Sequence, residues 1–282
     1  MSGDAGIVAG LPVPLAPLES MGMSLAPEEL AVLEAALRRL EGPGLAVRLA
    51  DALGSPVEAI GRVLPHAWQR RIDRAVTRAM SLAMNRAVAS LAAEPSSRRT
   101  HRLLGGASGA IGGFFGLAAL PVELPLSTVL MLRAIADIAR REGETLDDLE
   151  SRLACLTVFA LGSPLTAGDD AAETGYWTSR IALGQMVSEA GRHIARHGVT
   201  SGGPAIAALI HALASRFGLA LSAKASAQLV PILGAAGGAA LNLAFLAHFE
   251  SVARGHFAVR RLERKHGSEM VRAAAEELSR RS

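Results

Sequence analysis

The amino-acid sequence predicts an all-α fold, a single compact domain of about eight to ten helices with Gly/Ala-faced central helices. Three observations lead to this prediction. Apolar residues recur every three or four positions through most of the chain. No segment alternates apolar and polar residues for long enough to require a sheet. Clusters rich in Gly and Pro separate the periodic segments, as is typical of helix ends.

The composition narrows the kind of core and the classes of function. The 282 residues are 50% hydrophobic but only 4% aromatic, so we expect a core of Ala, Leu, Val, Ile and Gly rather than of stacked rings. The 29 basic and 26 acidic residues leave a net charge of +3, too small an excess for a surface that binds nucleic acid throughout. The lone cysteine, Cys155, excludes an intrachain disulfide and a Cys-based zinc site, and its apolar neighbours predict a buried thiol rather than a nucleophile.

The chain divides into residues 1–26, a Pro/Gly-rich segment that we interpret as a flexible arm, and residues 27–282, the helical domain. No basic region precedes the apolar residues of the arm, so we do not expect a secretory signal. The domain opens at Pro27, where Pro and the two following acids suit the first turn of a helix. That helix ends at residues 41–44, and a short helix follows to about Leu53.

Pro65 opens a long helix that reaches about Leu91 and has two unlike faces. One face is an apolar stripe, formed by Trp68, Ile72, Val76, Met80, Met84, Val88 and Leu91. The other carries one acid, Asp73, and the arginines Arg70, Arg71, Arg74, Arg78 and Arg86. A basic face of this kind can lie on an anionic membrane surface, and a face that is merely solvated has the same pattern, so both interpretations stay open.

Two uncharged segments carry glycines at helical spacing. In Gly105–Val122, positions 105, 109, 112 and 116 place glycines on one face, and the motif Pro121 to Pro125 is predicted to break this segment before an apolar helix that ends near Arg141. In Ala225–Ala247, Gly234, Gly237 and Gly238 repeat the pattern. A glycine face lets another backbone approach closely, so these segments predict either a tightly packed soluble core or insertion into a bilayer.

Capping residues and glycines predict the other helices. One helix runs from about Leu146 to Leu161, with Thr145 and Asp148 as a capping pair, and another from about Ala171 to His197. Beyond the break at residues 201–204, the spacing predicts a helix through Phe217, another through Val230 and a third from about Pro231 into Arg261. Gly267 precedes a final helix to Ser279.

Polar residues inside the apolar segments are the first candidates for a site. Arg133 and Asp137 lie four apart and can pair on one helix face. One hypothesis is that His248 and His256, with Glu123 or Asp137 as the acid, bind a metal ion. The alternative interpretation is that these residues form buried ion pairs and that the histidines are hydrogen-bonded within the core. The sequence contains no Walker loop, no His-Glu-x-x-His, no Gly-x-Ser-x-Gly and no dinucleotide-binding glycine motif. No cofactor, nucleotide or nucleic-acid partner is therefore predicted, and no residue is named as catalytic.

Several long motifs resemble the EcsC protein family. They are Gly112-Gly-Phe-Phe-Gly116, Pro121-Val-Glu-Leu-Pro125, the run from Ser127 to Arg140, the run from Arg152 to Gly162, Pro231 to Asn242, and His256 to Arg264. The resemblance is dense from about residue 100 to 267 and looser back to about residue 30. The family is named after a bacterial gene beside those of an ABC transporter, and the resemblance carries no established activity or catalytic residue. It implies an accessory to such a transporter rather than its motor.

The motifs shared with that family include embedded polar residues, so the resemblance implies that any site lies where these converge: Glu123, Arg133, Asp137, Asn242, His256, Arg260 and Glu263. His248, which interrupts the same apolar run as Asn242, completes the candidate cluster. We expect a non-catalytic accessory or regulatory protein at the cytoplasmic face of a membrane, peripheral to the inner membrane. Its expected partners are an anionic membrane surface and a transporter or another membrane protein. Two alternatives stay open, a metal-dependent hydrolase and a helical protein that binds a small molecule or lipid at a buried polar site.

Overall fold

The computed structural model describes residues 25–42, 45–53, 66–89, 120–163, 172–198, 203–227 and 235–281. These described residues form nine α-helices and no strand, which confirms the predicted all-α domain. The helices are α1 (Pro27–Leu40), α2 (Leu45–Leu53), α4 (His66–Ala89), α6 (Leu120–Arg141), α7 (Leu149–Leu161), α8 (Ala172–His197), α9 (Pro204–Ala227), α10 (Ala235–His266) and α11 (Ser268–Arg281). Of the predicted arm, only its last two residues are described, and Leu25 there is already buried.

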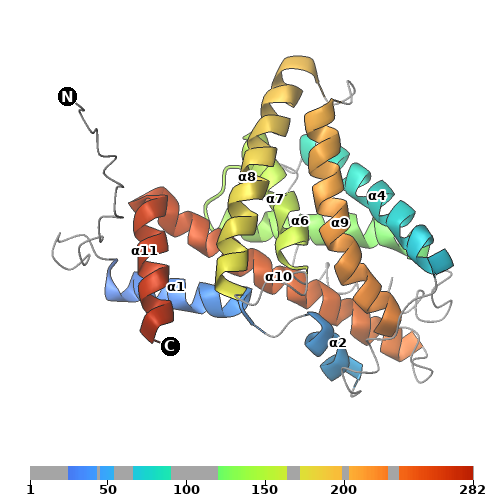
Figure 1. Ribbon diagram of the computed structural model, residues 1–282, viewed down its shortest axis with the longest axis horizontal. Coiled ribbons are helices and arrows are strands. Elements are labelled where there is room, and N and C mark those ends of the chain that lie inside the picture. Colours follow the sequence, from blue (N-terminus) through green and yellow to red (C-terminus); the bar gives the residue numbers. More distant parts are fainter. Residues whose placement is uncertain are drawn as a thin grey trace, which may run out of the picture.

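Helix α10, 32 residues long, is the element around which the others assemble. Helices α1, α2, α6, α7 and α11 all pack against it. Helices α8 and α9 pack against each other as an antiparallel pair that rises from the body of the molecule (Figure 1). Helix α4 packs on α6, α7 and α9. Because α10 contacts elements from both ends of the chain, side chains on it meet residues that lie far away in the sequence.

Several predicted helix ends are confirmed. Helix α1 begins at Pro27, with Glu28 and Glu29 in its first turn and the Glu29 carboxylate accepting the backbone N–H of Ala26 at 3.2 Å. Helix α8 ends at His197, where Gly198 has a φ of +75°. Gly267, with a φ of +88°, separates α10 from α11. Left-handed glycines of this kind are common helix stops because a Cβ atom disfavours that conformation.

Other predicted boundaries are wrong. The expected division after Phe217 does not occur, since α9 continues through Gly218 to Ala227. One glycine inside a helix costs only about 1 kcal/mol relative to alanine, which packing on α4, α7 and α8 readily offsets. Pro125 likewise lies inside α6 rather than in a break, and α10 extends past Arg261 to His266. Helix α7 starts three residues later than expected, because Asp148 itself is its N-cap.

The core contains more aromatic packing than the composition suggested. Phe159, Phe217, Phe245 and Phe249 are fully buried and form one cluster at the meeting point of α7, α9 and α10. Their ring centroids lie 5.0 to 5.9 Å apart in tilted or edge-to-face arrangements. Such pairs contribute about 0.5–1.5 kcal/mol each beyond their burial. The prediction of a core without ring packing was wrong because the few aromatic residues are concentrated at one point.

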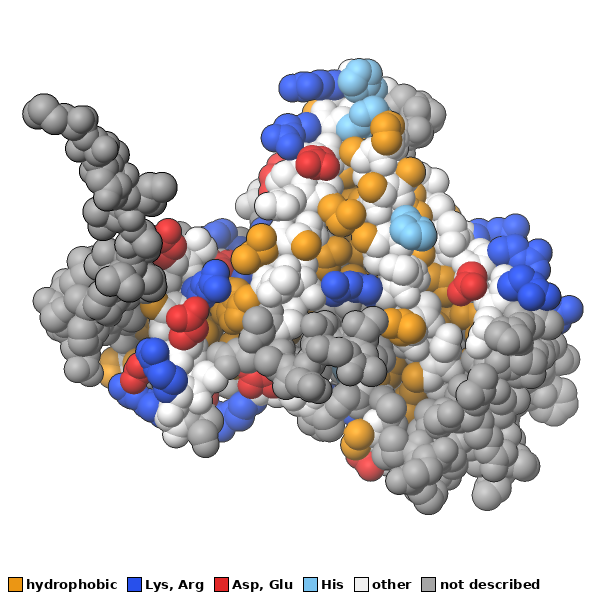
Figure 2. Space-filling view, in the orientation of Figure 1, with side chains coloured by type: hydrophobic (Ala, Val, Ile, Leu, Met, Phe, Trp, Pro, Cys, Tyr) orange, Lys and Arg blue, Asp and Glu red, His pale blue; other side chains and the backbone are white. Residues whose placement is uncertain are grey.

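Helix α4 has the two faces that the sequence predicted. Ile72, Val76, Met80 and Met84 are buried, whereas the five arginines of the opposite face are exposed: Arg70, Arg71, Arg74, Arg78 and Arg86. Lys and Arg side chains gather over α4 at the right edge of the space-filling view (Figure 2). Helix α4 packs on α6, α7 and α9, and Val88 of the predicted stripe is half-buried. The Trp68 side chain and Leu91 lie outside the described residues.

The structure describes the two glycine-containing uncharged segments, which were predicted either to pack tightly or to enter a membrane, to different extents. Gly105–Val122 lies outside the described residues except for its last three, which begin α6. The ends of Ala225–Ala247 belong to two different helices, α9 and α10, so this segment is not one spanning helix. Among the described residues, only Pro204–Ala225 is long and apolar enough to cross a membrane, and core helices of soluble proteins meet the same criterion.

Candidate functional site

The strongest polar cluster is built around Glu144, which the turn after α6 directs into the protein. The N–H of Gly143 donates to the carbonyl of Arg140 at 3.0 Å, and the N–H of Glu144 donates to the carbonyl of Ala139 at 3.0 Å. These two bonds, with a φ of +83° at Gly143, are the Schellman motif that commonly ends a helix. The chain therefore reverses at Gly143, and the Glu144 side chain is only 2% exposed.

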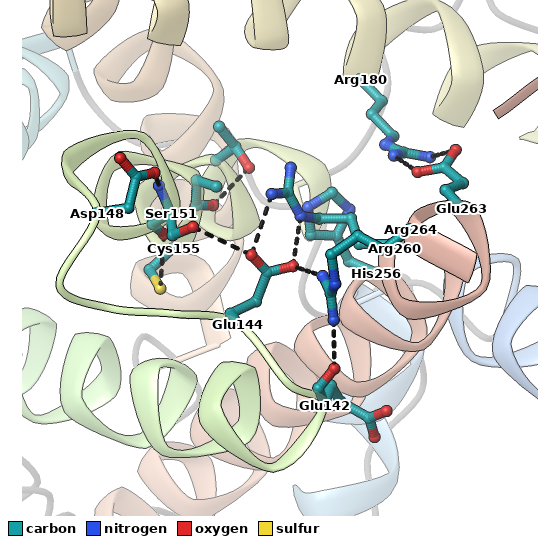
Figure 3. A network of polar contacts seen from close by, with 12 residues as sticks. Glu142, Glu144, Asp148, Ser151, Cys155, Arg180, His256, Arg260, Glu263 and Arg264 are labelled. Carbon is teal, nitrogen blue, oxygen red and sulfur yellow. Dashed lines mark hydrogen bonds and ion pairs between the residues drawn. The ribbon is translucent and has the colours of Figure 1, made fainter. Parts of the chain in front are cut away.

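Two arginines of α10 and a serine of α7 hold the Glu144 carboxylate (Figure 3). Arg260 donates from Nε at 2.8 Å and from a terminal nitrogen at 3.1 Å, one bond to each carboxylate oxygen. Arg264 also donates to Glu144, and it reaches the carbonyl of Glu142 as well. Ser151 donates its hydroxyl at 3.2 Å. Burial alone raises the pKa of the Glu144 carboxyl, but the hydrogen bonds and charge of Arg260, then the charge of Arg264, hold that pKa below its ordinary value.

The first turn of α7 completes this side of the cluster. The Asp148 carboxylate caps the helix by accepting the N–H of Ser151 at 3.0 Å, which fixes Ser151 beside Glu144. Cys155 lies one turn further on, fully buried, with its sulfur 3.4 Å from the Ser151 carbonyl. Burial, then the charge of Glu144, raise the pKa of the Cys155 thiol to about 12. The thiol is therefore protonated and inaccessible, as the sequence predicted.

A second group joins α8 to α10. Arg180 donates through two terminal nitrogens to the two oxygens of the Glu263 carboxylate, one of these bonds at 2.7 Å. The hydroxyl of Tyr176 lies 3.1 Å from Nδ1 of His256. Burial, followed by the charges of Arg180 and Arg260, lowers the pKa of His256 well below its ordinary value. The imidazole is therefore neutral at physiological pH.

A cavity of about 310 Å³ lies against this second group. We call it the α8–α10 cavity. Its lining comes from α7, α8, α10 and the first turns of α11: Glu150, Ala154, Thr157, Trp177, Arg180, Ile181, Gly184, Val187, His256, Arg260, Glu263, Ser268, Glu269 and Arg272. The side chains of Trp177 and His256 are buried, whereas Glu269 and Arg272 are exposed at its rim.

Only part of the site implied by the resemblance converges. His256, Arg260 and Glu263 all line the α8–α10 cavity. The buried Asn242 instead accepts from the buried Lys224 at 2.8 Å, between α9 and α10. His248 lines a different cavity of about 160 Å³ and donates from Nε2 to the Gly162 carbonyl at 2.6 Å.

Arg133 and Asp137, the predicted α6 residues whose side chains are described, do not line the α8–α10 cavity. Asp137 is buried and pairs with Arg140 at 2.6 Å, whereas Arg133, its predicted partner, is exposed. The side chain of Glu123 lies outside the described residues. His248 and His256 line different cavities, and the described part of the chain contains no group of three or more His, Cys, Asp or Glu side chains that could hold a metal ion. The arrangement therefore does not favour the metal-ligand hypothesis.

Sequence reasoning missed Glu144, Tyr176 and Arg180. Glu144 follows Arg-Arg-Glu-Gly at a helix end, a context typical of solvated residues, and its partner Arg260 lies 116 residues away. Arg180 is separated from Glu263 by 83 residues. The one local signal was Tyr176-Trp177, two adjacent aromatic residues in a chain with little aromatic content. Trp177 stacks its ring under Arg180, whose guanidinium carbon lies 5.4 Å from the ring centroid.

Comparison with known proteins gives one match. The family model described as EcsC protein family matches residues 30–262, well over half of the chain. No curated protein and no solved structure shows a significant match. The matched region includes Glu144, Arg180, His256 and Arg260, and it ends just before Glu263 and the first turns of α11 that form the rim of the cavity.

Proposed function

The chain belongs to the EcsC protein family, and from this premise we propose that it is a non-catalytic accessory or regulatory protein that works at the cytoplasmic face of a membrane. The observation that carries the proposal is the arginine face of α4, where Arg70, Arg71, Arg74, Arg78 and Arg86 are all exposed. An anionic leaflet attracts such a face, and a transporter or another membrane protein is the partner that the family resemblance implies.

The packing of α4 determines which kind of membrane contact is physically available. A helix that lies in the interface buries its apolar face among the lipids. Four large apolar residues of α4, Ile72, Val76, Met80 and Met84, are already buried, so the contact that the described side chains of α4 offer a membrane is electrostatic. Each basic side chain near an anionic surface contributes about 1 kcal/mol, and this attraction decays over a Debye length of about 8 Å at physiological salt. Binding through α4 is therefore reversible and sensitive to salt.

Charge reversal on α4 tests this proposal. The variant Arg70→Glu, Arg74→Glu, Arg78→Glu is compared with Arg38→Glu, Arg280→Glu, Arg281→Glu, which makes the same change in charge at three arginines that are also well exposed. Sedimentation with vesicles of phosphatidylcholine and phosphatidylserine measures binding. We expect the α4 variant to lose binding and the control variant to retain most of it. Equal binding by the two variants would contradict a membrane-facing α4.

The described residues support one of the two alternative functions, small-molecule binding, but not the other, metal-dependent hydrolysis. No described cluster of His, Cys, Asp and Glu supports a metal-dependent hydrolase. The α8–α10 cavity does support a protein that binds a small molecule at a polar site, since its wall includes the buried Trp177 and His256 beside Arg180 and Arg260. A membrane-associated accessory protein can also bind a small molecule, so this second function is compatible with the first.

A further inference from the structure

Two buried hydrogen-bonding groups in the wall of the α8–α10 cavity have no partner within the described part of the protein. They are Nε1 of Trp177 and Nε2 of His256. Trp177 as a whole residue is 8% exposed and His256 is 2% exposed. Buried polar atoms in native proteins almost always have a hydrogen-bond partner, because an unsatisfied one loses its hydration without compensation. Two such atoms in one cavity wall indicate a missing acceptor or donor in the cavity.

The chemistry of indole and the contact between Tyr176 and His256 lead us to assign both atoms as donors. The indole nitrogen of Trp177 always carries hydrogen. Nδ1 of His256, at 3.1 Å, is the hydrogen-bond partner of the Tyr176 hydroxyl, so we assign the hydroxyl as the donor and Nδ1 as the acceptor. Burial raises the pKa of Tyr176 to about 12, which keeps this hydroxyl protonated. In a neutral imidazole whose Nδ1 accepts, the proton resides on Nε2. The cavity wall therefore presents two N–H groups that require an acceptor.

The lining carries three arginines, Arg180, Arg260 and Arg272, and three acids, Glu150, Glu263 and Glu269, so its charges balance and the two N–H donors determine which acceptor is favoured. Arg180 and Arg260 both line the cavity, and their positive charges lower the pKa of His256. Glu263 lines the cavity too, but Arg180 engages both of its oxygens. Glu150 accepts from Ser188 at 3.1 Å, and Glu269 and Arg272 are both exposed at the rim. A carboxylate accepts such N–H bonds about twice as strongly as a neutral carbonyl does.

The rest of the lining and the volume limit the remainder of the ligand. Ala154, Ile181 and Val187 supply apolar wall, and Gly184 leaves open space, with no atom within 4 Å of where a Cβ would lie. A cavity of about 310 Å³ is at the small end of the range for ligand sites. We propose that the α8–α10 cavity binds a small carboxylic acid with an apolar tail, whose carboxylate accepts the N–H groups of Trp177 and His256.

Calorimetric titration of the full chain with octanoate tests this proposal. We expect saturable binding with a one-to-one stoichiometry and no binding of octylamine, which has the same tail and the opposite charge. Trp177→Phe removes one donor but keeps an aromatic ring at this position, and it should weaken octanoate binding about tenfold, since hydrogen bonds to charged groups are strong ones. Trp68→Phe, at the tryptophan of α4, should leave binding unchanged.

A variant that fills the cavity keeps the test independent of folding defects. Gly184→Leu places a side chain in the open space of the cavity and should abolish octanoate binding. Gly218→Leu on α9, where a Cβ also meets no atom within 4 Å, is the control and should bind normally. Absence of octanoate binding to the unmodified chain, equal binding of octylamine, or full binding by a folded Gly184→Leu variant would each overturn the proposal. None of these variants alters the arginine face of α4, so failure here is distinct from failure of the membrane role.

Discussion

Glu144 and Arg260, 116 residues apart, form a two-bond ion pair in which the Glu144 side chain is 2% exposed and that of Arg260 is 28% exposed. The pair fastens the turn after α6 to the C-terminal half of α10. Arg260 lines the α8–α10 cavity, so the same contact also positions part of the candidate binding site.

Removal of the Glu144 charge should be strongly destabilising. In Glu144→Gln, Arg260 and Arg264 lose the carboxylate that they share. We expect the free energy of unfolding to fall by roughly 3 kcal/mol. This is the lower end of the range for a broken buried ion pair, because both arginines reach solvent. Urea unfolding followed by circular dichroism measures the change. Glu277→Gln, at a carboxylate that is 43% exposed and pairs with Arg280 and Arg281, should have a much smaller effect, because solvent screens such surface pairs. A similar loss in both variants would show that burial of Glu144 is not energetically important.

Two glycines inside helices should respond in opposite directions to alanine. A Cβ at Gly255 would lie 2.8 Å from the Ala36 carbonyl oxygen and 2.8 Å from Cγ of Leu40, so Gly255→Ala must separate α1 from α10 and lower the melting temperature. A Cβ at Gly184 meets nothing within 4 Å, so Gly184→Ala should stabilise the protein by about 0.5–1 kcal/mol through helix propensity. Thermal unfolding checks both, and stabilisation by Gly255→Ala would refute the close helix contact.

Stability should fall as the pH drops through the range in which histidine titrates. Burial, then Arg180 and Arg260, keep His256 neutral in the folded protein, whereas an unfolded histidine has a pKa of about 6.5. Below that pH the unfolded chain binds a proton that the folded protein does not, so the free energy of unfolding decreases. Burial lowers the pKa of His248 too, despite the opposing hydrogen bond to Gly162.

Urea midpoints at about pH 7.5 and 5.5 measure this dependence. His256→Gln cannot take up the proton in either state, so it should show a smaller difference between the two midpoints whatever its absolute stability. His211→Gln, at an exposed position of α9, is the control. An unchanged difference in His256→Gln would mean that His256 does not contribute to the acid sensitivity.

Cys155 should be unreactive in the folded protein. The thiol is fully buried and burial raises its pKa to about 12, so thiolate at neutral pH is negligible. We expect labelling with a thiol reagent only after addition of guanidinium chloride, at the rate of global unfolding. Rapid labelling of native protein would contradict the packing of α7 against its neighbours.

The helices could be predicted from local sequence signals. Where a predicted helix end was wrong, the local sequence was compatible with more than one end position. Pro27, Gly198 and Gly267 each act through backbone geometry within one turn, so their effects can be read from the sequence. Gly218 is ambiguous because its cost depends on whether tertiary packing offsets it, and α9 has that packing. Asp148 was recognised as a capping residue but assigned a position inside the helix, which moved the predicted start of α7 by three residues.

The candidate site could be predicted only in part because it depends on distant pairings. His256, Arg260 and Glu263 were identifiable since they lie together on one helix. Their partners Tyr176, Glu144 and Arg180 come from α8 and from a turn, and no local pattern distinguishes them from solvated residues. Asn242 and His248 resembled members of the same site because they share α10, but they face other neighbours.

Fractionation of the protein at its native level in cells tests the proposed membrane role most directly. Membranes are washed first with high salt and then with alkaline carbonate, and the protein is followed through each step. Contact through the arginines of α4 predicts that the protein sediments with membranes and is released by salt, because screening removes the electrostatic attraction. Protein that stays in the soluble fraction, or that resists carbonate, would contradict a peripheral role at the membrane surface.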